Sequence, residues 1–230
     1  MKNSINNIGP TSNSNTQKLG LFPLTAHLMP GGRMQLRVFE PRYIRLVRDS
    51  LQNEQGFGLC MLNPEGDIAK NEHIHPIGTL AKIVDFETLN DGYLGITIVG
   101  EALFDIQSIE TEKDGLRTAK ISFRNEPENV VKVESERTQK CELKNRLQEV
   151  FANYPEFAAL YPDQYFDSAE WVCNRWLEIL PLAAEVKQEL LAANNLRVTQ
   201  NYLQCLFAEN NEDNQNDRED NVTQRKHRSI

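Results

Sequence analysis

The chain has 230 residues, with 25 Lys and Arg against 33 Asp and Glu, and a formal net charge of −8 at neutral pH. Its length allows one domain or two small ones with an ample core, and its acidic balance disfavours a nucleic-acid-binding protein, because phosphate backbones attract an excess of Lys and Arg. No apolar run approaches the ~20 residues needed to cross a bilayer, and the first 20 residues lack the apolar core of a secretory signal. Residues 1–19, rich in Asn, Ser and Thr, are predicted to be a disordered leader.

The cysteines lie far apart and form no Cys-x-x-Cys pair; they are Cys60, Cys141, Cys173 and Cys205. Each stands among apolar residues, which predicts buried, reduced thiols. Reduced thiols and the lack of a secretory signal indicate a cytoplasmic protein.

The stretch 21–43 predicts a strand, a corner, a second strand and the start of a helix. Residues 21–24 are apolar, and the chain breaks at residues 29–32, which read Met-Pro-Gly-Gly. In the strand that follows, one set of alternating residues is expected to face the core and the other to face away. The first set is Met34, Leu36 and Val38, and the second is Arg33, Gln35 and Arg37.

A helix is predicted from Pro41 to about residue 55, because Pro suits the first helical position and Gly56 is a plausible stop. Its expected core stripe is Tyr43, Ile44, Val47 and Leu51. Three arginines recur at every third position on another side, namely Arg42, Arg45 and Arg48. They could form a binding stripe, but the spacing of Arg45 and Asp49 favours a solvated face with an i,i+4 ion pair.

Between residues 56 and 126 the pattern is that of β-strands. Strands are predicted at 56–62, from 77 onward with a bulge near Ile83, at 93–100, at 102–106 and at 117–124. The segment up to Pro76 reads as a polar loop, and tight turns are predicted at Asp91-Gly92 and Asp114-Gly115. About six strands with one helix, over residues 20–126, predict a small barrel that closes its own edges.

The β pattern ends at Pro127, and residues 127–208 predict a helical subdomain. One helix start is well marked: Asp167 can cap it with Glu170 three residues later, and Phe166 can pack on Trp171. Residues 209–230 form a charged tail without core residues, which predicts disorder.

These landmarks together resemble a known family. The order Leu-x-Pro-Leu at 21–24, Pro-Gly at 30–31 and Glu-Pro-Arg-Tyr at 40–43 is similar to the start of the N-terminal substrate-recognition domain of the Lon proteases. Further landmarks follow in order: Asn63-Pro64, Ile77-Gly78-Thr79, Asp91-Gly92, Val99-Gly100 and Leu180-Pro181-Leu182. The resemblance covers about residues 20–208.

The resemblance implies an α+β fold in which a PUA-like β pseudo-barrel precedes a helical bundle. It also implies a module that binds unfolded or tagged protein segments, acting with a protease or a chaperone. We expect the recognition domain alone, without the ATPase and Ser-Lys peptidase domains of the full protease and without the Cys-x-x-Cys zinc module of cereblon-like relatives.

Signals for catalysis are absent from the sequence. It contains no Gly-x-x-x-x-Gly-Lys-Ser/Thr phosphate loop and no Gly-x-Ser-x-Gly elbow. His73 and His75 have a spacing that a metal site could use, but they are expected in an exposed loop without a third ligand. His27 is expected at the surface of a turn. The sequence therefore predicts no catalytic residue, no metal and no cofactor.

Two classes of function fit this sequence best. The favoured one is a non-catalytic protein- or peptide-binding module, an adaptor or regulator in protein quality control, and the alternative is an RNA-binding PUA-like protein. An enzyme would need a convergent set of titratable residues, which we do not find.

The binding site is predicted at the corner and the second strand, with Met29, Arg33, Met34 and Arg37 in contact with an extended peptide. The competing interpretation is that both methionines fill the core and both arginines make surface ion pairs.

Overall fold

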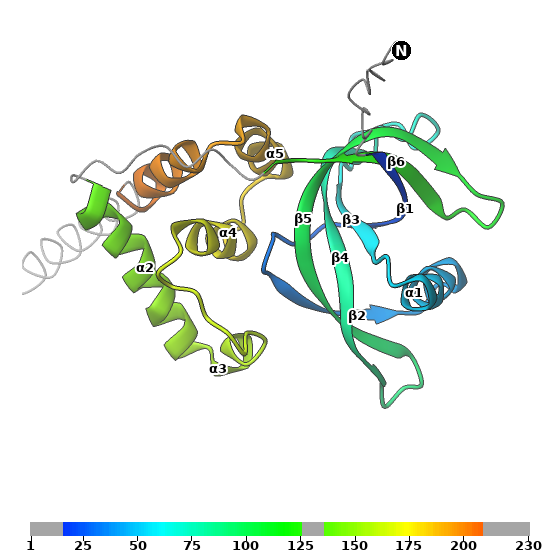
Figure 1. Ribbon diagram of the computed structural model, residues 1–230, viewed down its shortest axis with the longest axis horizontal. Coiled ribbons are helices and arrows are strands. Elements are labelled where there is room, and N and C mark those ends of the chain that lie inside the picture. The colour runs from blue at the N-terminus through cyan, green and yellow to red at the C-terminus, as the bar shows by residue number, and fades with distance from the viewer. Residues whose placement is uncertain (1–15, 126–135, 209–230) are drawn as a thin grey trace, which may run out of the picture.

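A computed structural model describes residues 16–125 and 136–208, and Figure 1 shows a β-barrel with a cluster of helices beside it. The strands are β1 (Thr16–Leu24), β2 (Arg33–Val38), β3 (Phe57–Leu62), β4 (Ile74–Thr88), β5 (Leu94–Thr111) and β6 (Arg117–Phe123). The helices are α1 (Pro41–Asn53), α2 (Glu136–Asn153), α3 (Pro155–Ala158), α4 (Ala169–Ile179), α5 (Ala184–Ala193) and a last helix over residues 196–208. The predicted α+β class is confirmed.

The strands form one sheet whose ends meet. The order is β2-β5-β4-β3-β1-β6, and β6 also pairs with β5, which closes a ring of five strands. β5 makes this possible because of its length: residues 94–99 pair with β2, and residues 104–111 pair with β6. All pairings are antiparallel except that of β1 with β3.

Two strands begin earlier than the sequence predicted. β1 starts at Thr16, inside the expected leader, because residues 16–20 pair with β6. β4 starts at Ile74, so the segment before Pro76 is not simply a polar loop. The bulge near Ile83 is confirmed by a register shift between Ile83 and Asp85. Residues 1–15, Pro127 and the tail 209–230 lie outside the described residues.

Helix α1 packs on one end of the barrel. It begins at Pro41 as predicted, and Glu54 and Gly56 end it with positive φ angles of 55° and 75°. A Cβ at position 56 would lie 2.4 Å from the carbonyl oxygen of Ala81, so glycine is required there. The predicted core stripe is only partly right: Val47 is buried with Leu46 and Ser50, whereas two members are exposed, Ile44 (44%) and Leu51 (43%).

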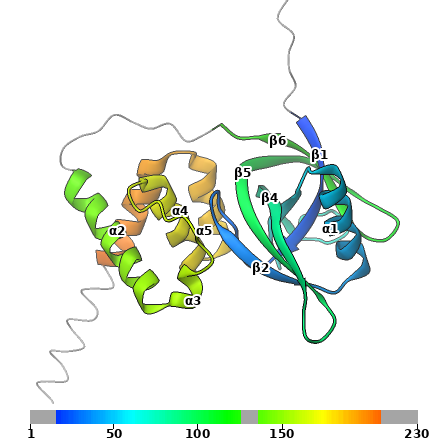
Figure 2. The ribbon, with the colours of Figure 1, turned by 60° about the horizontal axis from the view of Figure 1, so that its bottom comes forward.

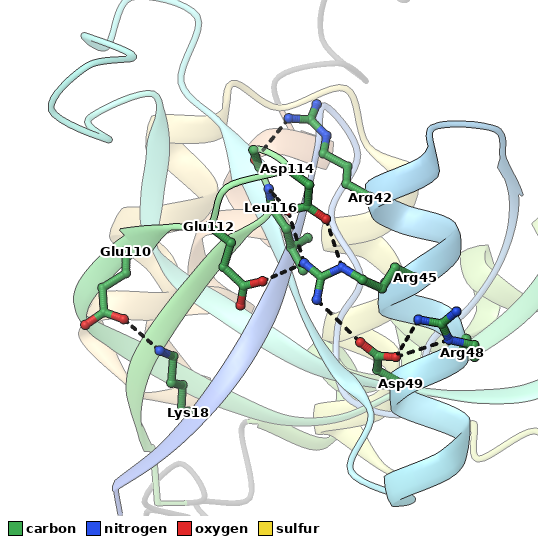
Figure 3. A network of polar contacts seen from close by, with 10 residues as sticks. Lys18, Arg42, Arg45, Arg48, Asp49, Glu110, Glu112, Asp114 and Leu116 are labelled. Atoms are coloured by element: carbon green, nitrogen blue, oxygen red, sulfur yellow. Dashed lines mark hydrogen bonds and ion pairs between the residues drawn. The ribbon is translucent and has the colours of Figure 1, made fainter.

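Arg45 ties α1 to the β5–β6 hairpin. Its guanidinium lies 2.6 Å from Glu112, 2.8 Å from Asp114 and 3.4 Å from Asp49, as Figure 3 shows. The predicted i,i+4 pair is therefore confirmed, within a larger network. Such half-exposed pairs contribute little energy each, but together they fix the helix against the hairpin.

The helices enclose their own aromatic core. Phe166 packs on Trp171 with ring centroids 5.3 Å apart, as predicted. The cap of α4 is Ser168 rather than Asp167: the Ser168 side chain accepts from the Trp171 N–H, and Asp167 instead pairs with Lys144 at 2.6 Å. A serine hydroxyl is as good a cap as a carboxylate, and it lies one residue closer to the helix.

The helices dock against the barrel beside β2 and β4 (Figure 2). Met29 and Ile77, from the barrel, belong to the apolar core of the helices. Gln188 of α5 accepts from the Ile77 N–H and donates to the Ile77 carbonyl, both at 3.0 Å. Arg124, just after β6, donates to the carbonyl of Leu191 near the end of α5. The junction therefore combines an apolar core with direct hydrogen bonds between the barrel and α5.

Candidate functional site

The structure disperses the four residues of the predicted binding site. Met29 is 0% exposed, because α4 covers it. Met34 is half-buried against the barrel core, and the N–H of Arg33 donates to the Tyr161 hydroxyl at 3.5 Å. For Met29 the competing interpretation, that it fills the core, is correct. Its side chain cannot form part of an accessible surface.

Arg37 is the member of the predicted site that stands exposed. Its guanidinium lies 3.0 Å from the Asp91 carboxylate and 4.3 Å from the centre of the Tyr93 ring. The ion pair is of the kind that the competing interpretation expected. Arg37 also lines a surface hollow that sequence reasoning missed.

The hollow has a volume of about 540 Å³ and lies where the ends of β1, β2 and β3 meet α1. Four separate stretches of the chain line the hollow, so no local sequence motif could predict it. Its wall is mainly apolar and includes Phe22, Leu24, Leu36, Tyr43, Leu62 and Ile68. Phe22 stacks on Tyr43 with ring centroids 4.2 Å apart, so this part of the wall is rigid. The volume is within the range of ligand-binding clefts, roughly 300–1,000 Å³.

Large apolar side chains stand exposed at the rim. Phe39 is 59% exposed and Ile68 is 66% exposed. Phe39 also meets Tyr93 edge to face at 6.2 Å. Its position between a strand and Pro41 was visible in the sequence, and a Phe in such a turn is the one local signal that could have indicated the rim. Large exposed apolar side chains that line the same hollow are typical of interaction sites.

One side of the hollow is polar and cationic, with Arg42, His73 and Arg117 among its lining residues. Arg42 pairs with Glu40 at 2.7 Å and donates to the Gly115 carbonyl at 3.1 Å, at the edge of the network in Figure 3. Arg117 donates through Nε to Asn71 Oδ1 at 3.1 Å. Burial, and then the charge of Arg117, lower the pKa of His73. The hollow can therefore accept an apolar group with a negative charge beside it.

The three histidines near the barrel were misplaced by the sequence analysis. His27, His73 and His75 are 3%, 9% and 8% exposed, so none lies on an exposed turn or loop. His27 faces Lys187 of α5, and His75 Nε2 lies 3.7 Å from the Glu185 carboxylate. Docking of α5 on β4 buries His75, a contact that local sequence cannot reveal. Within residues 16–125 and 136–208, no three His, Cys, Asp or Glu side chains gather as a metal site.

The cysteine prediction holds in part. Cys60 and Cys173 are buried, and burial strongly raises the pKa of the Cys60 thiol. Cys205 is exposed, against expectation, because it lies on the outer side of the last helix. No helix in the described part of the chain is both long and apolar enough to cross a membrane.

Comparison with known proteins assigns most of the described chain to one protein family. Residues 18–198 match the family model of the ATP-dependent protease La (LON) substrate-binding domain. The chain belongs to that family. The family resemblance found in the sequence over residues 20–208 is thereby confirmed, with the family model ending at residue 198.

Solved structures of LON domains share the fold. A Lon N-terminal domain protein from Xanthomonas campestris superposes with a TM-score of 0.65 at 27% identity, over 82% of this chain and 98% of that one. The N-terminal domain of a Mycobacterium avium complex Lon protease superposes with a TM-score of 0.56 at 12% identity, over 81% and 96% of the two chains. The second likeness concerns the fold alone.

A curated relative, the protein cereblon of Danio rerio, is 28% identical over 111 residues. The match covers 46% of this chain and 25% of the length of cereblon. The matched region therefore spans only a quarter of the length of cereblon.

Proposed function

We propose that this LON domain is a non-catalytic module that binds unfolded or tagged protein segments at the hollow between β2, β3 and α1. The observation that carries the proposal is an apolar hollow of about 540 Å³ with Phe39 and Ile68 exposed at its rim. Unfolded chains differ from folded proteins chiefly in their accessible apolar side chains, and a surface of this kind selects for them.

In this proposal Arg37 keeps the role that the sequence gave it, at the edge of the peptide site. Met34 and the Arg33 backbone stay in the second strand beside it, and Met29 supports the strand from within the core. The outer edge of β2, which pairs with β5 on one side, could add an extended segment of peptide, since edge pairing tolerates many sequences.

The wider role that we propose is that of an adaptor or regulator in protein quality control, working with a protease or a chaperone in the cytoplasm. The buried, unbridged thiol of Cys60 agrees with a reducing compartment. No observation favours RNA instead: the arginines of α1 are engaged with carboxylates, as for Arg45, and the chain carries a net charge of −8.

The test measures binding of a fluorescently labelled, reduced and carboxymethylated model protein that cannot fold. We expect the wild-type chain to bind it, and the double variant Phe39→Ser with Ile68→Ser to bind at least about tenfold more weakly. Tyr154→Ser is the matched control, because Tyr154 is similarly exposed (55%) but lies on the helical side. Circular dichroism melting verifies that every variant is folded.

Two results would contradict the proposal. One is binding that the rim variant leaves unchanged, and the other is binding lost equally in Tyr154→Ser. A labelled single-stranded RNA of mixed sequence serves as the second probe. Its retention at physiological salt, with no retention of the unfolded protein, would favour the RNA-binding alternative.

A further inference from the structure

The cationic side of the hollow carries more charge than nearby carboxylates neutralise. Arg37 pairs with Asp91, and Arg42 pairs with Glu40. Arg117 differs: among the described residues no carboxylate lies within ion-pair distance of it, and its Nε is engaged with the neutral amide of Asn71. One positive charge therefore remains uncompensated beside an apolar wall, in a protein that is acidic overall.

Two buried polar atoms of the lining also lack partners. Arg42 Nε and His73 Nδ1 are enclosed, yet neither makes a hydrogen bond within residues 16–125 and 136–208. Buried donors and acceptors are nearly always paired in native proteins, because leaving them unpaired costs the full desolvation penalty. The lining at Arg42 and His73 is therefore short of negative charge and of hydrogen-bond acceptors, and the unmatched charge of Arg117 beside them suits an anion as ligand.

We propose that the hollow captures the free C-terminus of a polypeptide whose last residue is large and apolar. The terminal carboxylate lies against Arg117 and His73, and the last side chain lies against Phe22, Leu24 and Tyr43. This inference rests on the proposed function and names its substrate class, the end of a chain rather than an internal segment.

The chemistry favours a chain end for a specific reason. In an internal segment an apolar side chain has only neutral amide groups beside it, whereas a C-terminal apolar residue joins a full negative charge and an apolar group within a few ångströms. The wall and the cations of the hollow are adjacent in the same way. The N–H groups of Arg side chains bind carboxylates with charge-assisted hydrogen bonds, which a C-terminal amide cannot form with equal strength.

The experiment compares two peptides that differ in one group. Both are ten residues long, carry a fluorophore at the N-terminus and end in Leu, one as the free acid and one as the amide. Fluorescence anisotropy with the full wild-type chain should show the acid binding about tenfold more tightly or better, which is the size expected for a hydrogen bond to a charged group. The comparison is made in the wild-type protein, so it does not depend on the folding of a variant.

Arg117→Gln should abolish the preference for the acid while retaining residual binding of both peptides. Gln keeps a donor for Asn71 but removes the charge. Arg48→Gln is the matched control, since Arg48 is an exposed α1 arginine that does not line the hollow. It should leave the preference intact, although the net charge of the protein changes by the same amount.

Binding of the unfolded model protein, measured in parallel, separates this inference from the proposed function. Equal affinity for acid and amide, with binding of the unfolded protein retained, overturns end recognition and leaves the proposed function standing. If the wild-type chain binds neither the peptides nor the unfolded model protein, both proposals are overturned. Retention of palmitate without either peptide would also overturn end recognition, since the carboxylate would then belong to a lipid.

Discussion

The carboxylate of Glu178 accepts the backbone N–H of Met29 at 2.6 Å, across 149 positions of sequence. The same carboxylate receives Arg175 Nε at 2.6 Å, and Arg175 also donates to the Pro30 carbonyl at 3.1 Å. Arg175 is fully buried. The corner between β1 and β2 is thus held by a buried ion pair that belongs to α4.

Removing Glu178 should therefore destabilise the whole protein. Glu178→Ala leaves the Arg175 guanidinium buried without its counter-charge, and we expect a loss of ~3–5 kcal/mol in the free energy of unfolding. Urea titration followed by circular dichroism measures it. Glu142→Ala breaks an exposed ion pair with Arg146 and should change stability by no more than about 0.5 kcal/mol. Similar losses in both variants would show that the Arg175 pair is not buried in solution.

Met29 and Met34 should respond differently to the same substitution. Met29→Ser removes a fully buried side chain and puts a hydroxyl in the apolar core, with an expected loss of ~2–5 kcal/mol. Met34→Ser, at a half-buried position, should cost less than about 1.5 kcal/mol. Thermal melts of the two variants provide the comparison, and a milder effect at Met29 would place its side chain at the surface.

Acid should weaken the fold through His27. Burial, followed by the charges of Lys187 and His75, lowers the pKa of His27 from 6.5 to about 3. The unfolded chain takes up a proton near pH 6.5 while the folded chain does not, so stability falls as the pH drops below that value. Between pH 7 and pH 5 this contribution amounts to about 2 kcal/mol.

His27→Leu should remove that part of the pH dependence. His73, whose pKa burial also lowers, remains in both proteins and cancels in the comparison. Urea titrations at pH 7 and pH 5 give the two differences in stability. If the free energy of unfolding falls by the same amount in both proteins, the pKa of His27 is not lowered in the folded state.

Trp176 should be among the most sensitive positions of the helical part. It is 4% exposed, its indole N–H donates to the Leu143 carbonyl at 3.0 Å, and its ring meets that of Phe207 at 4.7 Å. Trp176→Ala should cost ~3–5 kcal/mol in urea titration. A loss below about 1 kcal/mol would place the ring at the surface, whereas Tyr154→Ala, at an exposed position, should stay within about 0.5 kcal/mol.

Sequence reasoning succeeded where the physical cause is local. Pro41 begins a helix because of its own fixed φ, Gly92 and Gly115 have the positive φ that their turns require, and Phe166 meets Trp171 five residues away. The family resemblance also came from short landmarks whose order along the chain could be read directly.

The rest depends on contacts between distant segments. Met29 and His75 are buried because helices more than a hundred residues later dock on them, and no property of their neighbours indicates this. The hollow likewise arises where residues 22–24, 36–43, 62–73 and 117 meet. From the sequence alone, the apolar residues of its wall are expected in the core and its cationic residues at the surface. Only the folded barrel brings the two groups together.

The pairing of β1 with β6 has a consequence for biosynthesis. Residues 16–20, near the start of the chain, find their partners at residues 118–122. The ribosome synthesises β1 about a hundred residues before β6. During that time the edge of β1 that will pair with β6 is unpaired, and an unpaired strand edge is prone to pair with other chains. The barrel closes only when β6 arrives, so a chaperone that shields β1 on the ribosome should increase the yield of native protein.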